Sequence, residues 1–237
     1  MVSKVKLFCI PHAGGLSSIY YGWKDKLEDH IELIPIELPG RGTRANRPLC
    51  DNIQEVVLDL YREIRPYLDD SPFAIFGHSF GALLTYELIH LIKEASRREP
   101  LHVFFSGKLP LHIPVSRICH TLSRTEFEEY IIGLGGIPPE LHNCTEILDL
   151  FLPIIRADIK LVETYQLKED SIKPLPVDIS ILHGSEDQIA DKKRLVEWTS
   201  YTSRQCHFHD FPGGHFFIND RTENVVNVVN RTLSRVC

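Results

Sequence analysis

The chain has 237 residues, of which 43% are hydrophobic and 24% are charged, and its formal net charge is −6. This composition is typical of a globular protein that is long enough to bury a sizeable core. The acidic balance argues against a nucleic-acid-binding protein, which would carry a basic face.

Cysteine usage and hydropathy indicate the compartment. The six cysteines are scattered without a CxxC pair or a Cys/His metal spacing, so we expect reduced thiols, no metal and no disulfide framework. The apolar run near the N-terminus is too short for a signal peptide, and no stretch approaches the length of a membrane span. We therefore expect a cytoplasmic protein that does not associate with membranes.

Short apolar runs alternate with amphipathic stretches along the chain. The runs that predict strands are Val5–Ile10, Ile31–Leu38, Phe73–Gly77, Leu101–Ser106, Val177–His183 and Gln205–Phe211. The stretches that predict helices are Ile19–Glu28, Asn52–Leu68, Ala82–Ser96, Lys192–Ser200 and Glu223–Leu233. This alternation is typical of an α/β fold with a mostly parallel sheet covered by helices on both faces.

Residues 108–176 interrupt this alternation. Periodicity places four apolar side chains of this segment on one helical face, and they are Phe127, Tyr130, Ile131 and Leu134. A second, nearly all-apolar helix follows, and we expect a kink or break in it at Pro153. We interpret the chain as a single domain, 1–237, with a helical lid inserted at about 110–170; an ordinary pair of core helices is the alternative.

The stretch FGHSFG (76–81) predicts a nucleophile. A G-x-S-x-G pattern between a buried strand and a helix is typical of the nucleophile elbow, a strained turn that exposes the serine hydroxyl. Gly77 and Gly81 are expected to be glycines because the turn passes close to its neighbours. Ser79 is the predicted nucleophile.

A serine nucleophile needs a histidine base oriented by a carboxylate, in the chain order Ser, acid, His for this fold. Asp187 lies in the turn after one strand, and His215 lies on a Gly-rich loop after the next. His78, His183 and His209 are expected to be structural histidines. For the acid, Glu186 and Asp191 near the same strand end remain alternatives to the better placed Asp187, whereas Asp158 on the lid helix is out of chain order.

Two backbone N–H groups are expected to form the oxyanion hole. One belongs to Phe80, which follows the nucleophile, and Ala13 in the early turn PHAGG is the candidate for the other. A plain glycine turn is the alternative reading of PHAGG.

The motifs FCIPHAGG, ELPGRG, FGHSFGA, GSEDQIA and FPGGHFF, in this order, closely resemble the stand-alone (type II) thioesterases that accompany nonribosomal peptide and polyketide synthases. The resemblance covers essentially the whole chain and implies an α/β-hydrolase fold. It also implies the roles of five residues: a Ser79–His215–Asp187 triad and the oxyanion donors Ala13 and Phe80. The family commonly has methionine where Phe80 stands, so its rigid ring is expected to reshape the acyl entrance.

By this resemblance, the protein hydrolyses acyl thioesters on the phosphopantetheine arm of carrier-protein domains, as a monomer and without a cofactor of its own. Arg41, Arg44 and Arg47 are candidates to meet an acidic carrier, and a solvated loop is the alternative. An acyl-CoA thioesterase, a general esterase or a medium-chain fatty acyl-carrier hydrolase on the same fold remains open, as does a non-catalytic binding module.

Overall fold

A single parallel sheet forms the centre of the molecule. The structure is a computed structural model that describes residues 4–137, 139–142 and 144–236. Over these residues six strands have the order β2-β1-β3-β4-β5-β6, and every neighbouring pair is parallel. The strands are β1 (Val5–Ile10), β2 (Ile31–Pro35), β3 (Phe73–His78), β4 (His102–Ser106), β5 (Ile179–Gly184) and β6 (Cys206–Phe211). The predicted α/β class is confirmed.

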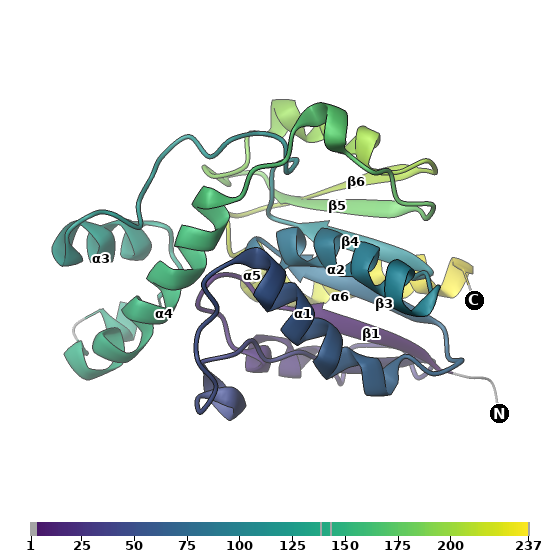
Figure 1. The fold of residues 1–237 in the computed structure, drawn as a ribbon, viewed down its shortest axis with the longest axis horizontal. Coiled ribbons are helices and arrows are strands. Elements are labelled where there is room, and N and C mark those ends of the chain that lie inside the picture. The colour runs from purple at the N-terminus through teal and green to yellow at the C-terminus, as the bar shows by residue number, and fades with distance from the viewer. Residues whose placement is uncertain (1–3, 138, 143, 237) are drawn as a thin grey trace.

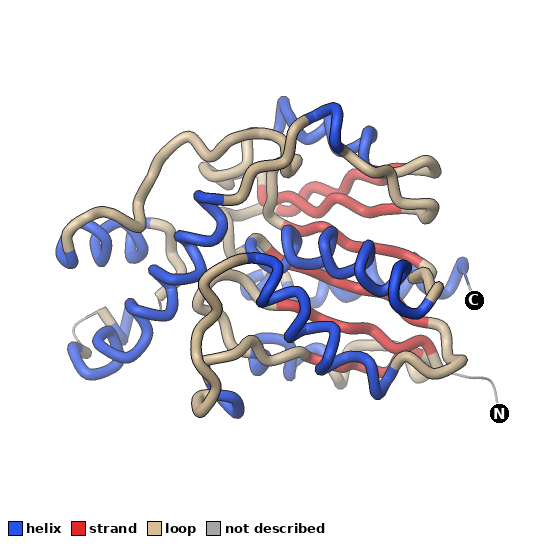
Figure 2. Tube along the Cα trace, viewed as in Figure 1, coloured by secondary structure: helices blue, strands red, loops and turns tan. Residues whose placement is uncertain are grey.

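Helices cover both faces of this sheet (Figure 1, Figure 2). The α-helices are α1 (Ile53–Ile64), α2 (Phe80–Ser96), α3 (Arg124–Gly133), α4 (Thr145–Thr164), α5 (Phe217–Asp220) and α6 (Thr222–Val236). In Figure 1, α1 and α2 lie in front of the sheet and α6 lies behind it. In the described ranges, no helix combines the length and the apolar character needed to cross a membrane.

The side chains of β1 show why the sheet is covered on both faces. Successive side chains of a strand point to opposite faces. Phe8 and Ile10 join the cluster formed with α1 and α2, whereas Leu7 and Cys9 join the cluster formed with α6. Each fully buried side chain of this kind stabilises the fold by roughly 1.5–3 kcal/mol. The near-continuous apolar run of the strand follows from this two-sided burial.

Two of the predicted helices are 3₁₀-helices, η1 (Ser17–Trp23) and η6 (Lys192–Tyr201). Their buried residues recur at every third position, and they are Ser17, Tyr20 and Trp23 in η1 and Leu195, Trp198 and Tyr201 in η6. A 3₁₀-helix has three residues per turn, so this spacing places all buried residues on one side. The burial pattern of these two segments therefore fits the three-residue period of a 3₁₀-helix better than the 3.6-residue period of an α-helix.

Two further differences from the predicted boundaries lie at a proline. The helix expected over Asn52–Leu68 divides into α1 and the 3₁₀ turn η3 (Arg65–Tyr67), which contains Pro66. Strand β2 ends at Pro35, although the next N–H, that of Ile36, still donates to the Cys9 carbonyl at 2.9 Å. Strand β1 matches its predicted range, and the remaining strands differ from theirs by one or two residues at one or both ends. The remaining short 3₁₀ turns are η2 (Gly42–Arg44), η4 (Pro139–Leu141) and η5 (Glu169–Ser171).

The segment between β4 and β5 carries α3 and α4, and we call it the insertion. These helices project beyond the carboxyl ends of the strands (Figure 1). The predicted apolar face of α3 packs in a cluster of the insertion's own, in which Phe127 and Ile131 are buried. A kink or break is expected at Pro153; the break does not occur, since α4 is one continuous helix from Thr145 to Thr164. Leu152 and Ile155 pack in the same cluster on either side of Pro153 and hold the helix together.

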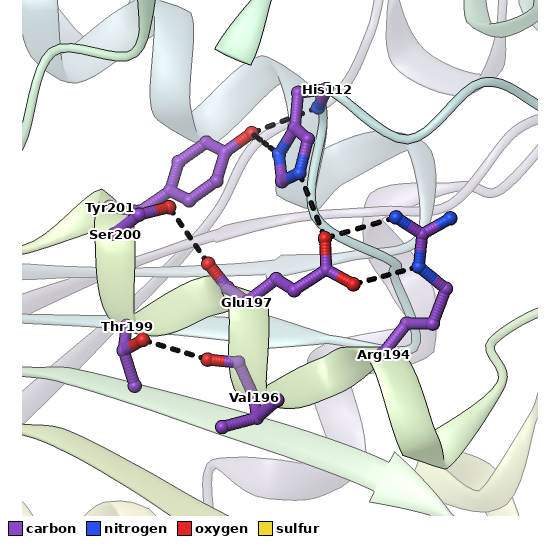
Figure 3. Close-up of polar contacts among 7 residues, drawn as sticks. All are labelled: His112, Arg194, Val196, Glu197, Thr199, Ser200 and Tyr201. Atoms are coloured by element: carbon purple, nitrogen blue, oxygen red, sulfur yellow. Dashed lines mark hydrogen bonds and ion pairs between the residues drawn. The ribbon is translucent and has the colours of Figure 1, made fainter. Parts of the chain in front are cut away.

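A polar network fastens the start of the insertion to η6 (Figure 3). The His112 N–H donates to the Tyr201 hydroxyl at 2.9 Å, and the His112 ring lies 3.0 Å from Glu197 Oε2. Arg194 Nε donates to Glu197 Oε1 at 2.7 Å. The Trp198 indole also donates to the Lys108 carbonyl at 2.9 Å. The chain leaving β4 is therefore held by side-chain hydrogen bonds.

Candidate active site

Ser79 lies between β3 and α2 in a backbone conformation that few non-glycine residues adopt. Its φ is 55° and its ψ is −109°, a strained combination of the kind that clusters at functional sites. A Cβ on Gly77 would lie 2.3 Å from the Gly81 carbonyl oxygen, and one on Gly81 would lie 2.2 Å from the Ile10 carbonyl oxygen. Both glycines are therefore required by close backbone approach, as predicted.

The loops after β5 and β6 bring the other two predicted side chains to Ser79. His215 Nε2 lies 2.9 Å from Ser79 Oγ, and His215 Nδ1 lies 2.8 Å from Asp187 Oδ2. The two loops are joined by the Glu186 N–H, which donates to the Gly213 carbonyl at 2.9 Å. The three side chains form one continuous hydrogen-bonded chain from carboxylate to hydroxyl.

Asp187 is buried but is held in its ionised form. Burial raises the pKa of this carboxyl, and hydrogen bonds from His215 and from the backbone N–H groups of Ile189 and Ala190 outweigh that effect, so the pKa lies below its usual value. Because an ionised carboxylate only accepts hydrogen bonds, His215 must donate to it from Nδ1. The Nε2 atom is then free to accept the Ser79 proton.

The histidines considered as alternatives do not contact Ser79. His78 is fully buried, its Nδ1 lies 2.9 Å from Ser106 Oγ, and burial lowers its pKa well below the usual value. His183 and His209 lie within β5 and β6, as expected, and burial lowers the pKa of each. One ring nitrogen of each finds no hydrogen-bond partner among the described residues, which a neutral imidazole tolerates best.

The alternative acids also lie elsewhere. The Asp191 side chain accepts the Lys193 N–H at 2.9 Å, and Glu186 is exposed. Asp158 lies on α4 and pairs with Arg41. Among the described carboxylates, Asp187 is the one that contacts the His215 ring.

The predicted oxyanion donors lie on two segments that pack together. The start of α2 touches the loop after β1, because a Cβ on Gly81 would lie 2.8 Å from the Pro11 carbonyl oxygen. Phe80 is the first residue of α2, so its N–H has no acceptor within the helix. Neither this N–H nor that of Ala13 donates to another group in the described part of the chain. Both remain available to an external oxyanion.

The structure corrects the expectation for two of the three basic residues. Arg41 is buried against Asp158, and Arg44 donates two hydrogen bonds to Asp59, at 2.7 and 2.8 Å. Neither is free to meet a partner, and only Arg47 is exposed. The Arg41–Asp158 pair is the feature that sequence reasoning missed. The available signal was a lone acidic residue on the buried side of an apolar helix.

Metal-binding geometry is not found here: within the described ranges, no three His, Cys, Asp or Glu side chains gather as a metal site would require. The groups that converge at Ser79 are a hydroxyl, an imidazole and a carboxylate, with two backbone N–H groups nearby. This set fits acyl transfer through a serine nucleophile.

A family model described as the thioesterase domain matches residues 5–233. The chain belongs to the thioesterase family. This thioesterase is 33% identical over 235 residues to the gramicidin S biosynthesis protein GrsT of Aneurinibacillus migulanus, covering 99% of this chain and 91% of that protein. It is also 33% identical over 221 residues to the human medium-chain S-acyl fatty acid synthase thioesterase, covering 91% of this chain and 81% of that protein.

A solved structure agrees with these relatives. The crystal structure of ClbQ from the colibactin NRPS/PKS pathway matches this thioesterase with a TM-score of 0.94 and 35% identity, covering 99% of this chain and 98% of that one. The predicted family and the α/β-hydrolase fold are confirmed, and the chain is an enzyme of the thioesterase class. The alternative of a non-catalytic module receives no support from these relatives.

Proposed function

We propose that this thioesterase hydrolyses acyl thioesters carried on the phosphopantetheine arm of carrier-protein domains, and that it removes stalled or aberrant acyl groups from a nonribosomal peptide or polyketide synthase. The observation that carries the chemistry is the hydrogen-bonded chain Ser79–His215–Asp187 on a strained elbow. The pathway follows from relatives whose names place them in gramicidin S and colibactin biosynthesis.

The reaction takes two acyl-transfer steps. His215 Nε2 removes the proton of Ser79, whose Oγ attacks the thioester carbonyl, and the N–H groups of Ala13 and Phe80 bind the oxyanion that forms. The tetrahedral intermediate expels the thiol, which takes the proton from His215, and an acyl-serine remains. Water, deprotonated by His215, then attacks this ester, and Ser79 leaves with the proton as the free acid is released.

Asp187 and the oxyanion donors both lower the barrier to acyl transfer. Asp187 stabilises the imidazolium that forms on His215 and holds the ring in the required tautomer. One oxyanion donor lowers the barrier by about 3 kcal/mol. The proposal also includes a monomer that needs no cofactor of its own and works in the cytoplasm.

The insertion supplies the side of the site that would meet the acyl chain. Phe80 begins α2, a helix that contacts α4, and its ring is buried in the core cluster that also includes Leu161 of α4. The proposal includes a reshaped acyl entrance at this ring. The carrier would dock where the insertion borders the core.

A second substrate class has a specific observation in its favour. The human relative is a medium-chain fatty acid synthase thioesterase and is as similar in identity, 33%, as GrsT. The coverage of that protein is lower, 81% against 91%. We therefore rank medium-chain fatty acyl carriers behind synthase carriers.

Single-turnover hydrolysis tests the proposal. Acetyl-carrier protein, acetyl-CoA, a medium-chain acyl-carrier protein and a simple ester are compared, with Ser79→Ala as the control. Fast, Ser79-dependent release from the acetyl carrier supports the proposal. A preference for the CoA thioester or the simple ester would contradict the carrier as substrate, and a preference for the medium chain would favour the second class.

A further inference from the structure

The insertion reaches the oxyanion loop through a buried ion pair. Arg41, in the loop after β2, donates from Nη2 to Asp158 Oδ1 at 2.8 Å and from Nη1 to Asp158 Oδ2. The two side chains are 2% and 5% exposed. This planar, two-bond geometry is the strong form of an arginine–carboxylate pair.

Asp158 also accepts a hydrogen bond from the loop after β1. The Gly14 N–H donates to Asp158 Oδ2 at 2.7 Å, a buried and charge-assisted contact. Ile155, one turn earlier on α4, touches the same glycine, because a Cβ there would lie 2.2 Å from Ile155 Cγ1. Gly14 has a φ of +74°, which also favours glycine. Helix α4 thus contacts Gly14 at two points.

This contact fixes one peptide group beside the expected oxyanion donor. The Gly14 N–H belongs to the peptide that joins Ala13 to Gly14. Its carbonyl oxygen, that of Ala13, accepts a hydrogen bond from His12 Nδ1 at 3.0 Å. With its N–H and its C=O both bound, this peptide plane cannot rotate, so the ψ angle of Ala13 is held. The Ala13 N–H belongs to the preceding peptide, whose carbonyl, that of His12, accepts a hydrogen bond from the Gly15 N–H at 2.9 Å. The turn from His12 to Gly15 is therefore held internally, and Asp158 anchors it to α4 through the Gly14 N–H.

Stability alone does not explain a buried pair at this position. Replacing such a pair by apolar side chains of similar volume is often neutral or stabilising, whereas removing one partner leaves a buried charge. The pair is located where α4, the loop after β2 and the oxyanion loop meet. A requirement for orientation accounts for a carboxylate that accepts from both loops.

We propose that Asp158 is a positioning residue of the oxyanion hole: held by Arg41, it anchors the turn from His12 to Gly15 through the Gly14 N–H and so places the Ala13 N–H, which this turn carries, toward the oxyanion. The insertion is then part of the catalytic apparatus as well as a cover for the site. This inference rests on the proposed function, since it takes Ala13 as an oxyanion donor.

The test compares turnover with affinity for an oxyanion mimic. The substrates are acyl-N-acetylcysteamine thioesters, which need no carrier, and the mimic is an alkyl trifluoromethyl ketone, whose adduct with Ser79 places an oxyanion in the hole. For Asp158→Asn we expect kcat to fall at least about tenfold with little change in KM. Complete loss of one oxyanion donor lowers kcat by about 10²–10³-fold, and a misplaced donor loses part of that contribution. The ketone inhibition constant should rise by the same factor.

A double variant separates positioning from stability. Arg41→Met/Asp158→Leu removes both charges, so we expect a melting temperature equal to or above that of the unaltered protein. Its kcat and its ketone affinity should still be reduced. Asp149→Asn is the matched control, because it removes an exposed ion pair, with Arg124, from the same helix, and it should leave both quantities unchanged.

The outcomes are distinguishable from those of the proposed function. Full activity and full ketone affinity in the double variant would overturn the positioning role. A kcat loss without a matching loss of ketone affinity would overturn it as well. If the unaltered protein fails to form a Ser79-dependent ketone adduct, the proposed nucleophile fails, and the carrier comparison above tests the substrate separately.

Discussion

The two sides of the proposed site are built in different ways. Ser79, Asp187 and His215 each follow a strand of the sheet, and close backbone approaches in the core fix their loops. The insertion instead packs mainly around its own small cluster. It is joined to the core by the His112 network, by the Asp158 pair and by a limited apolar contact with α2.

This difference separates chemistry from selectivity. The loops of the triad belong to the part of the molecule with the most buried apolar contacts, where local opening costs the most free energy. The insertion has fewer such contacts, so it is expected to open at lower cost. An acyl-binding wall of this kind can vary without disturbing the nucleophile.

The largest expected effect is the loss of turnover when Ser79, on the sheet side of the site, is replaced. Ser79→Ala should lower turnover on the order of a million-fold, because the nucleophile of a serine triad is lost. Ser79→Gly should lose turnover equally but unfold at a higher temperature than Ser79→Ala, since glycine relieves a φ of 55°. We expect a difference of about 1 kcal/mol in free energy of unfolding. Thermal melts and single-turnover kinetics measure both, and equal melts would argue against strain at the elbow.

A pair of glycine variants compares the two sides directly. Gly81→Ala places a Cβ against the backbone oxygen of Ile10 at 2.2 Å, so the elbow must shift. We expect severe loss of activity and of stability. Gly133→Ala, at the end of α3, meets nothing within 4 Å and should be neutral or stabilising by up to about 1 kcal/mol. Urea unfolding and turnover check this, and a tolerated Gly81→Ala would contradict the tight elbow.

An insertion variant should leave the core folded. Phe127 is fully buried beneath the Arg156 guanidinium, whose carbon lies 4.0 Å from the ring centroid. Phe127→Ala should cost about 3–5 kcal/mol locally. We expect hydrogen exchange of α3 and α4 to accelerate while that of β1, β3 and β4 is unchanged.

The matched control for this variant is Leu150→Ala, because Leu150 is 63% exposed on α4. It should leave exchange throughout the chain unchanged. Equal acceleration in the strands and in the insertion of Phe127→Ala would show one cooperative unit and would remove the distinction between the two sides.

The fold was largely predictable because its signals are local. Strands buried on both faces read as apolar runs, the elbow carries two glycines that close approach requires, and the His loop carries Gly213, whose φ of +119° favours glycine. The 3₁₀-helices were missed because residues buried at every third position resemble one face of an α-helix over two turns. The course of α4 through Pro153 depends on packing that no local pattern reveals.

The triad geometry was predictable for a related reason, since three loops at the carboxyl edge of one parallel sheet must converge. The Arg41–Asp158 pair was not. Its members are 117 positions apart, and a charged residue in an exposed-looking glycine loop is usually solvated. Only the docking of α4 against that loop brings the two together, and that docking is a tertiary event.

The smallest expected effect concerns the core under acid. His102 on β4 is buried, with Nε2 2.9 Å from Ser180 Oγ, and burial lowers its pKa from 6.5 to about 4. Between these values the unfolded chain binds a proton that the folded chain does not. The free energy of unfolding therefore falls as pH decreases from 6.5 towards 4, by at most about 3 kcal/mol from this residue.

His102→Asn keeps a polar partner for Ser180 and cannot take up that proton. Above pH 7 the variant should be less stable, because it fills the buried space less well. The gap between the two proteins should then narrow as the pH falls to 4.5, since only the unaltered protein loses the stability linked to His102. Urea unfolding at pH 8, 6 and 4.5 measures the gap. A constant gap would mean that His102 titrates alike in both states and that acid acts on the core through other groups.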